Sequence, residues 1–390
     1  MQVDARQLGA VGNGQADDTE ALQKALTGGH RTVTIPSGVY KISATLKVDS
    51  HTTIKAAPQA VIRLADHAGK DVNVFLLCNR DLESGNAGIT VEGGIWDGNN
   101  EHNPRGREGD PKGYTGAAIN FVNVRKLAIR NLTVRNPEAF SIRLCAVEDF
   151  TIEDVRFDAT VIRPNQDGVH LNGFCHRGVI RNLRALTPRT PNDDMVALNA
   201  DDATDRVINL GMKCGPISDI AVENLQADDA YTFVRLLSFK ERIENVTISN
   251  VSGGCRAYAI NLDRWRFPVG GGDIRHVTLR NFNVRKVDGR EFAKWSNQAP
   301  LIPIQSIVHD LRIENFHRDP ADKLPAPTLV VDNGQRNRLR LEGATGEQTG
   351  NKVVLPRGGF SLLALDPAPG ADTLPIADRI RPIAKGTGFA

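Results

Sequence analysis

Aromatic residues and long apolar runs are scarce in this 390-residue sequence. Phe, Tyr and Trp make up 5% of it, with four Tyr and three Trp. No segment approaches the run of about eighteen apolar residues that a membrane-spanning helix needs, so we expect no contact with a membrane. Few aromatics beside 36 Gly and many short β-branched runs favour repetitive β-structure with tight turns over a helix bundle.

An excess of charge of one sign is also missing. The 48 basic and 46 acidic residues leave a net charge of +2, without the basic clustering of a nucleic-acid-binding protein. The five cysteines form no C-x-x-C pair, which favours free, mostly buried thiols over a disulfide framework or a metal site. The opening MQVDARQ has no signal-peptide pattern, although a mature secreted form would look the same. We therefore predict no nucleic-acid partner, metal or cofactor, and leave the compartment open.

A repeated four-residue unit, apolar–x–Asn–apolar, organises the chain. Asparagine at a tight turn tolerates left-handed backbone geometry and can form side-chain amide ladders, and alternating apolar residues around it fit strands with one buried face. Asp154 takes the Asn position in one of the seven copies. These copies are IRNL (129–132), IEDV (152–155), IRNL (180–183), VENL (222–225), ISNV (248–251), LRNF (279–282) and IENF (313–316).

A second series of short apolar strands recurs between these turns: AINF (118–121), SIRL (141–144), GVHL (168–171), MVAL (195–198), FVRL (233–236) and AINL (259–262). Two or more short strands in each repeat of about 23 to 30 residues are typical of a parallel solenoid with coils about 4.8 Å apart. A β-sandwich would instead show hairpin turns at closer spacing. We predict an all-β fold, a single-stranded right-handed parallel β-helix.

The length fits one domain over residues 1–390. We expect an N-terminal cap and first coils over 1–50, central coils with the candidate site over 51–318, and last coils with a C-terminal cover over 319–390. A solenoid exposes an apolar end that must be covered. The segment Asp17–Glu20, then ALQKAL and two glycines, predicts a short capping helix with Asp17 as its N-cap.

Three carboxylates are predicted to meet on neighbouring coils. Asp167 lies two residues before the inward Val169, and Asp194 lies two before Val196, so stacking places these carboxylates at one height with backbones about 5 Å apart. Asp193 lies beside them. Like charges this close raise at least one pKa and cost stability. We therefore interpret the group as a candidate active site, although aspartate is also common in turns.

The outward positions one residue further along each strand form a polar column: Asn120, Arg143, His170, Ala197, Arg235 and Asn261. Arginine offers forked donors to the carboxylates or hydroxyl pairs of a sugar, so we predict a carbohydrate substrate bound along this column. His170 either orients an acid or donates to substrate. Asp263 and Arg264 extend the column, and Trp265 either stacks on a sugar or anchors its own loop.

Three segments carry a resemblance to a known family. NPEAF (136–140), RPNQDGVHLN (163–172) and PNDDMVALN (191–199) resemble glycoside hydrolase family 28, the polygalacturonases and their relatives. In that family N-S-P-x-W/F precedes an N-T-D-G strand, and G-D-D-C/M-I-A-I follows on the next coil. GGIWDGNN (93–100) is similar to the family's G-G-x-I-D-G-x-G strand. The opening segment resembles pectate-lyase-like β-helix proteins, and the likeness covers most of residues 3–316.

The resemblance implies an inverting glycoside hydrolase that cleaves an O-glycosidic bond in a plant or bacterial saccharide. Asp193 then matches the general acid, Asp167 and Asp194 the pair that holds the attacking water, and Arg235 a substrate-binding arginine. Inverting enzymes separate acid and base by about 6.5–9.5 Å. The resemblance also favours a secreted or periplasmic location. We expect a monomer and no cofactor.

Two departures from the family pattern concern the sugar. The family's G-H-G coil is missing, and Leu237 stands where the family's R-I-K strand has its Lys. Those groups help to hold a galacturonate carboxylate in polygalacturonases, so the resemblance does not fix a uronate as substrate. His170 or Arg143 could supply the missing donor.

Two other classes of function stay open at this point. A polysaccharide lyase on the same fold would remove a proton next to a uronate carboxylate, with a Lys or Arg base and often Ca²⁺ held by acids. The column contains no Lys. A non-catalytic carbohydrate-binding β-helix would bind sugars without turnover.

Overall fold

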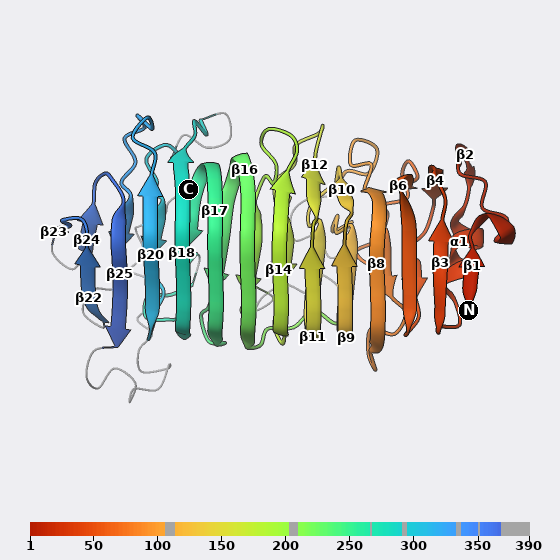
Figure 1. Cartoon of the computed structure of the whole chain (residues 1–390), viewed down its shortest axis with the longest axis horizontal. Helices are drawn as coiled ribbons and strands as arrows, with labels where there is room; N and C mark the ends of the chain where they lie inside the picture. The colour runs from red at the N-terminus through yellow and green to blue at the C-terminus, as the bar shows by residue number, and fades with distance from the viewer. Residues whose placement is uncertain are drawn as a thin grey trace.

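The computed structural model describes residues 1–105, 114–202, 210–265, 267–290, 295–332, 337–349 and 352–367. In this part the chain consists of strands and the loops between them, apart from helix α1 (Thr19–Leu26) and a single 3-10 turn, η1 (Arg6–Leu8). The strands lie side by side along the long axis of an elongated molecule, in nearly chain order (Figure 1). The all-β class and the parallel arrangement of the strands are confirmed, and the right-handed sense of the coils stays a prediction.

Strands of successive coils pair in three parallel series. The first comprises β1 (Gln2–Asp4), β3 (Arg31–Ile35), β6 (Thr52–Leu64), β8 (Asn86–Asp97), β9 (Ile119–Arg130), β11 (Ile142–Glu153), β14 (His176–Ala185), β16 (Ile217–Leu237), β17 (Ile243–Asn261), β18 (Ile274–Lys286) and β20 (Leu311–Arg318). The second adds β2 (Asn13–Asp17), β4 (Gly38–Ile42), β10 (Thr133–Arg135) and β12 (Arg156–Asp158). The third adds β5 (Leu46–Val48), β7 (Leu77–Asn79), β13 (Val169–Leu171), β15 (Asp194–Asn199), β19 (Ile302–Ile304) and β21 (Leu329–Val331).

Long strands connect these series because they continue through a bend. The first half of β16 pairs with β14 and its second half with β15. The register follows the predicted repeat, since Val169 pairs with both Ile142 and Val196. These inward side chains are fully buried, in one apolar core that contains residues from Ala5 to Leu365. Burial at about 25 cal/mol per Å² thus fixes the height of every coil and of the polar residues beside it.

The predicted asparagine ladder is present at the turns from Asp154 to Asn315. All seven residues at the third place of the repeat, Asp154 included, have φ between 53° and 60°, the left-handed region that asparagine tolerates. From Asn182 to Asn315, each side-chain amide donates to the side-chain oxygen one coil earlier, at N···O distances of 2.9–3.2 Å. Asp154 begins this ladder because a carboxylate only accepts hydrogen bonds.

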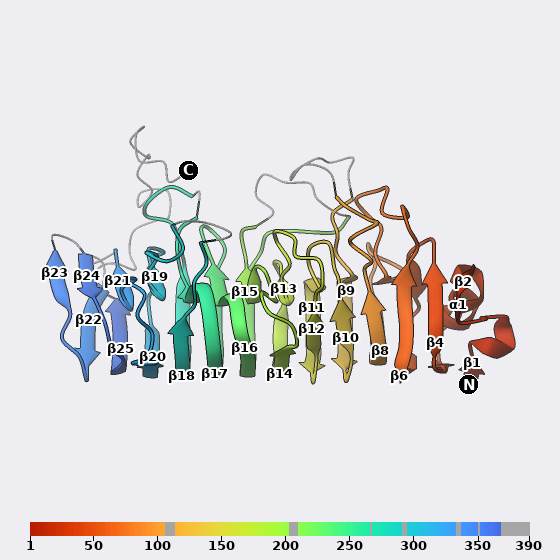
Figure 2. The ribbon, with the colours of Figure 1, turned by 90° about the horizontal axis from the view of Figure 1, so that it is seen from above.

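Helix α1 lies at the N-terminal end of the stack (Figure 2) and buries Leu22, Ala25 and Leu26. Its N-cap is Asp18, so the prediction of Asp17 is wrong by one residue. The Asp18 carboxylate accepts from the backbone N–H groups of Val11 and Gly12 instead of capping the helix. Asp17 accepts from the Thr19 N–H at 3.0 Å. The turn chemistry before the helix therefore joins it to the first coils.

The other end of the stack changes from parallel to antiparallel pairing. Strand β25 (Phe360–Pro367) runs antiparallel to both β20 and β22 (Asn337–Glu342). Strand β24 (Lys352–Leu355) runs antiparallel to β21 and to β23 (Glu347–Thr349). These strands form part of the predicted last coils. Residues 368–390 of the predicted C-terminal cover lie outside the described residues.

All five cysteines belong to the described part of the chain and are free thiols, four of them buried. This confirms the prediction made from their spacing. Within the described residues, no helix is long and apolar enough to cross a membrane.

Candidate active site

Three aspartates meet where β13 and β15 begin. The pairing of Val169 with Val196 places Asp167 and Asp194 at equivalent positions of adjacent coils, and the Gly168 N–H donates to the Asp194 carbonyl at 2.9 Å. Asp193 immediately precedes β15. The stacking predicted from sequence spacing is therefore present. Figure 2 shows long loops rising on the side of the stack where β13 and β15 lie.

Gly168 allows these two coils to approach each other closely. A Cβ atom at this position would lie 2.4 Å from the Met195 carbonyl oxygen and 2.9 Å from the Phe157 ring. Any larger residue would push the coil that carries Asp167 away from the one that carries Asp194. The Asp-Gly pair thus has a steric cause as well as a turn preference.

The three carboxyl groups are in different environments and differ in exposure and in pKa. Asp167 and Asp194 are 3% and 4% exposed, whereas Asp193 is half-buried. Burial and the charge of Asp167 raise the pKa of Asp193 to about 7. Burial and the charge of Asp193 raise the pKa of Asp194 well above its usual range. Asp193 is thus the member of the group that is both accessible and able to hold a proton near neutral pH.

His170 lies between two acids. Its Nδ1 is 2.5 Å from Asp167 Oδ2, and its Nε2 is 3.5 Å from Asp202 Oδ2. Burial opposes the charged imidazole, but these carboxylates raise the pKa of His170 to about 9, so the ring is a cation at neutral pH. Burial raises the pKa of Asp167, and the hydrogen bond and charge of His170 oppose that rise. Of the two sequence interpretations, the structure therefore favours His170 as the residue that orients an acid.

The predicted polar column exists, but it is not an open surface. Asn120, Arg143 and His170 pair across successive strands, and Arg235 pairs with Asn261. Asn120, Arg143, His170 and Asn261 are at most 2% exposed, so the expectation of an outward surface is wrong for these four. One physical reason is Phe140, which lies 4.8 Å from both the Arg143 guanidinium and the His170 ring centroid.

Arg143 is held within the column. Its Nε donates to Asn120 Oδ1 at 3.0 Å. Burial lowers the pKa of Arg143 to about 10, although the charges of Asp202 and Asp167 oppose that effect. Positive and negative side chains thus alternate from the column toward the three aspartates, in the order Arg143, Asp202, His170 and Asp167. Direct contact of Arg143 with substrate stays a prediction.

Arg235 lies beside the aspartates on the next coil. Its Nη2 donates to Asp263 Oδ1 at 2.9 Å, and the Asp263 N–H donates to Asn261 Oδ1 at 2.9 Å. Burial disfavours the cation, yet Asp263, Asp194 and Asp193 raise the pKa of Arg235 above its usual value. The structure thus brings Arg235, Asn261 and Asp263 together next to the acids, as the column predicts.

The next two residues contact their own loop, and the Trp265 ring also lies 5.9 Å from the Arg235 guanidinium. Arg264 donates from Nη1 to the Phe267 carbonyl at 2.7 Å. The Trp265 ring packs edge-on against Phe267 at 5.8 Å, which stacks on Phe239 at 4.7 Å. For Trp265 this favours the interpretation as a loop anchor, and Arg264 uses at least one guanidinium nitrogen on that loop rather than on a ligand.

Several residues around the three aspartates were not among the predicted site residues. Asp202 follows β15 in a segment outside the repeat, where register gives no guidance. Asn165, which donates to Asp193 Oδ2 at 3.2 Å, is the Asn of the N-Q-D-G segment and could have been singled out there. Arg256 and three aromatic residues, Tyr231, Tyr258 and Trp295, also belong to this region. Only their rarity in the composition could have marked the aromatic ones.

Comparison of the sequence with known proteins assigns the chain to a family. A model of the family described as "Rhamnogalacturonase A/epimerase, pectate lyase-like" matches residues 2–257. A probable polygalacturonase of Arabidopsis thaliana is 24% identical over 292 residues, which are 73% of this chain and 59% of that protein. The chain thus spans less than two thirds of that relative's length.

Solved structures share the fold. The family 28 exopolygalacturonase of Yersinia enterocolitica aligns with a TM-score of 0.55 at 15% identity, covering 84% of this chain and 67% of that one. PfbA, a surface adhesin of Streptococcus pneumoniae, aligns with a TM-score of 0.52 at 14% identity, covering 84% of this chain and 82% of that one. Identities this low concern the fold alone. The match to residues 2–257 and the polygalacturonase relatives confirm the predicted resemblance: the chain belongs to the rhamnogalacturonase A/epimerase, pectate lyase-like family and is similar to polygalacturonases.

Proposed function

We propose that the protein hydrolyses a glycosidic bond of a pectic polysaccharide with inversion at the anomeric carbon. The observation that carries this proposal is the group of three aspartates, in which one half-buried carboxyl has a pKa of about 7 and two buried carboxyls lie on adjacent coils. An acid that keeps its proton near neutral pH and a second carboxylate to accept one are the two requirements of this reaction. The polygalacturonase relatives support the choice of substrate class.

In the proposed reaction Asp193 gives its proton to the glycosidic oxygen as the bond from that oxygen to the anomeric carbon breaks. The bonding electron pair leaves with the oxygen. A water molecule held by Asp167 and Asp194 attacks the anomeric carbon from the opposite face, and its proton passes to Asp167. His170 acts on Asp167 through the 2.5 Å contact, which stabilises the carboxylate form that the reaction requires.

A lyase is supported less well by the same residues. It needs a base that is neutral at working pH, and the arginine beside the aspartates, Arg235, has its pKa raised by the surrounding acids against the effect of burial. Within the described ranges, no three His, Cys, Asp or Glu side chains are arranged to hold a metal ion. The non-catalytic alternative differs from the hydrolase by the absence of turnover.

The stereochemistry of the product tests the proposal. Polygalacturonate and rhamnogalacturonan should be incubated separately with the protein and followed by ¹H NMR from the first minutes. We expect the first product to carry the anomeric configuration opposite to that of the cleaved bond, before mutarotation equalises the anomers. Retention of configuration, an unsaturated product or no cleavage of either polymer would contradict the proposal.

The dependence of the reaction on pH should follow the two proposed roles. Since Asp193 must be protonated, kcat/KM should fall as the pH rises through about 7, the pKa of this carboxyl. Since Asp167 must be ionised, kcat/KM should also fall on the acid side. Initial rates across the range from acidic to mildly alkaline pH, at substrate concentrations far below KM, report these groups in the free enzyme.

A His170→Gln variant tests whether His170 sets the acid limb of this profile. Glutamine can still donate a hydrogen bond to Asp167 but carries no charge, so the pKa of Asp167 should rise. The acid limb should then move upward by about one pH unit, while the alkaline limb moves less. An unchanged acid limb would mean that His170 does not act through Asp167.

A further inference from the structure

Three aromatic side chains gather next to the aspartates in a chain that has few of them. The Trp295 ring lies 6.4 Å from the Tyr231 ring at 88° and 6.0 Å from the Tyr258 ring at 33°. Tyr231 and Tyr258 are half-buried, and Trp295 is 39% exposed. Two of the four tyrosines and one of the three tryptophans in the sequence thus form one partly accessible cluster, here called the aromatic platform.

The aromatic platform adjoins the proposed catalytic acid through the backbone. The Tyr231 N–H donates to the Pro191 carbonyl at 3.0 Å, and the Thr232 N–H to the Asp193 carbonyl at 3.4 Å. Tyr258 follows on the next strand, where it pairs with Thr232. Burial and then the charge of Asp193 raise the pKa of Tyr231. The platform therefore lies on the side of the later coils, directly beside Asp193.

Buried cations hold the aromatic platform in place. Arg256 is 1% exposed, lies 5.7 Å from the Tyr231 ring centroid and donates to Asn192 Oδ1 at 2.8 Å. It therefore ties the tyrosine to the residue before Asp193. The buried Lys286 lies 5.9 Å from the Tyr258 ring and donates to the Ala257 and Ala299 carbonyls, which connects the segment of Trp295 to β17. A site on such a rigid frame is pre-organised for a ligand.

Partly exposed aromatic rings beside a carboxyl suit a sugar ring. The C–H groups on one face of a pyranose are apolar and pack on aromatic rings, and Tyr and Trp add a polar edge for hydroxyl groups. We propose that Tyr231, Tyr258 and Trp295 form a subsite that binds a pyranose unit of the pectic chain next to the bond being cleaved. This inference rests on the proposed function for the identity of the chain, and on the platform's own geometry for the stacking.

Binding to an inactive variant tests the subsite separately from catalysis. In the Asp193→Asn background, Trp295→Ala and Trp295→Phe should be titrated by calorimetry with a disaccharide and with a hexasaccharide, prepared both from polygalacturonate and from rhamnogalacturonan. We expect Trp295→Ala to lower the affinity for the hexasaccharide about three- to tenfold. Trp295→Phe should keep most of that affinity because a flat ring remains. Thermal unfolding of each variant shows whether the fold is intact.

The outcomes separate the subsite from the reaction. If the wild type cleaves a pectic polymer but Trp295→Ala leaves the hexasaccharide affinity unchanged, the subsite is wrong and the proposed function stands. If that affinity falls but the wild type shows no turnover, the subsite stands and the hydrolase is wrong. Failure of the Asp193→Asn protein to bind either hexasaccharide overturns the subsite. Should Trp295→Ala fail to fold, Tyr258→Ala replaces it with the same expected loss.

Discussion

Replacing Asp193 by asparagine should lower kcat by about a thousandfold while the protein stays folded. Asparagine has the shape of the carboxyl group but cannot give a proton to the leaving oxygen, and general acid catalysis contributes about 10²–10⁴ in rate. Stability should not fall at about pH 8, where the wild-type carboxyl is mostly ionised next to Asp167, because its pKa is about 7. Release of reducing ends and thermal unfolding at that pH measure the two effects.

Asp228→Asn is the matched control for this variant. Asp228 is exposed on β16, and it is not part of the proposed site, so the same chemical change should leave kcat within twofold of the wild type. Retention of sugar binding by Asp193→Asn would fit both a hydrolase and a binding protein, but only the hydrolase loses turnover. An Asp193→Asn protein with wild-type kcat would remove Asp193 from its role and leave the acid unidentified.

The repeat made much of this site predictable, for a physical reason. Side chains alternate across a strand, and parallel strands of successive coils stay in register. The spacing of Asp167 and Asp194 to the nearest inward valine was therefore sufficient to stack them. The Asn ladder follows from the same rule, since residues at one corner of every coil must adopt one backbone geometry.

Residues outside the repeat could not be found in this way. Asp202 and Trp295 belong to segments between strands, where sequence distance does not determine spatial distance. The burial of Arg143 was missed for a related reason: alternation shows that a side chain points away from the core, but not whether a neighbouring loop covers it. Phe140, which lies over the guanidinium, comes from such a loop.

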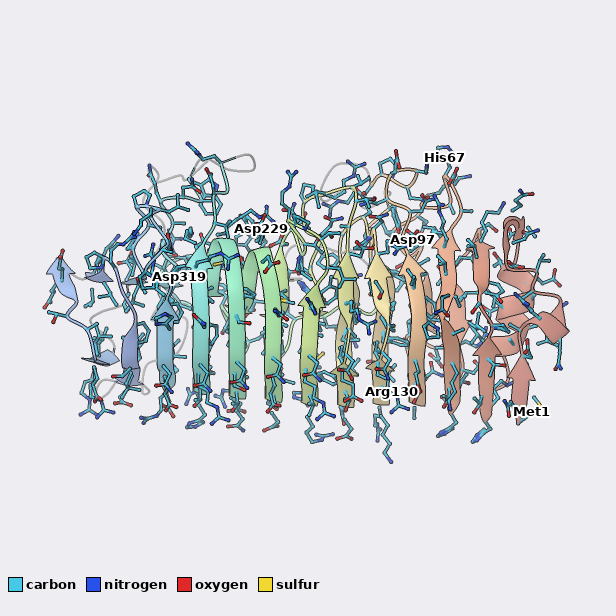
Figure 3. All side chains as sticks on the ribbon, turned by 45° about the horizontal axis from the view of Figure 1, so that its top comes forward. Met1, His67, Asp97, Arg130, Asp229 and Asp319 are labelled. Atoms are coloured by element: carbon cyan, nitrogen blue, oxygen red, sulfur yellow. The ribbon has the colours of Figure 1, made fainter. Side chains whose placement is uncertain are left out.

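Replacing Arg256 by leucine should destabilise the protein by about 2–4 kcal/mol, the largest stability effect that we expect. The Arg256 Nε lies 2.7 Å from Asp229 Oδ1, and Arg256 Nη1 donates to Asn192 Oδ1. Removing one partner of a buried ion pair leaves the other charge uncompensated, which costs about 3–5 kcal/mol when both are fully buried. The Asp229 side chain, labelled in Figure 3, keeps 22% exposure, which reduces the expected loss. Urea unfolding of both proteins measures it.

The pH dependence of that loss identifies its cause. Burial already raises the pKa of Asp229, against the effect of Arg256, so removal of the cation should raise this pKa further. The folded variant then binds a proton at a pH where the unfolded chain does not, and its deficit should shrink as the pH falls. The double variant Arg256→Leu/Asp229→Asn should regain part of the stability at neutral pH because no charge is left unpaired. A deficit that is the same at every pH would instead indicate lost packing against Tyr231, whose ring lies 5.7 Å from the guanidinium.

Since the Arg256–Asn192 contact also positions the segment of Asp193, kcat should fall in the single variant and stay low in the double variant, which restores charge balance but not that contact.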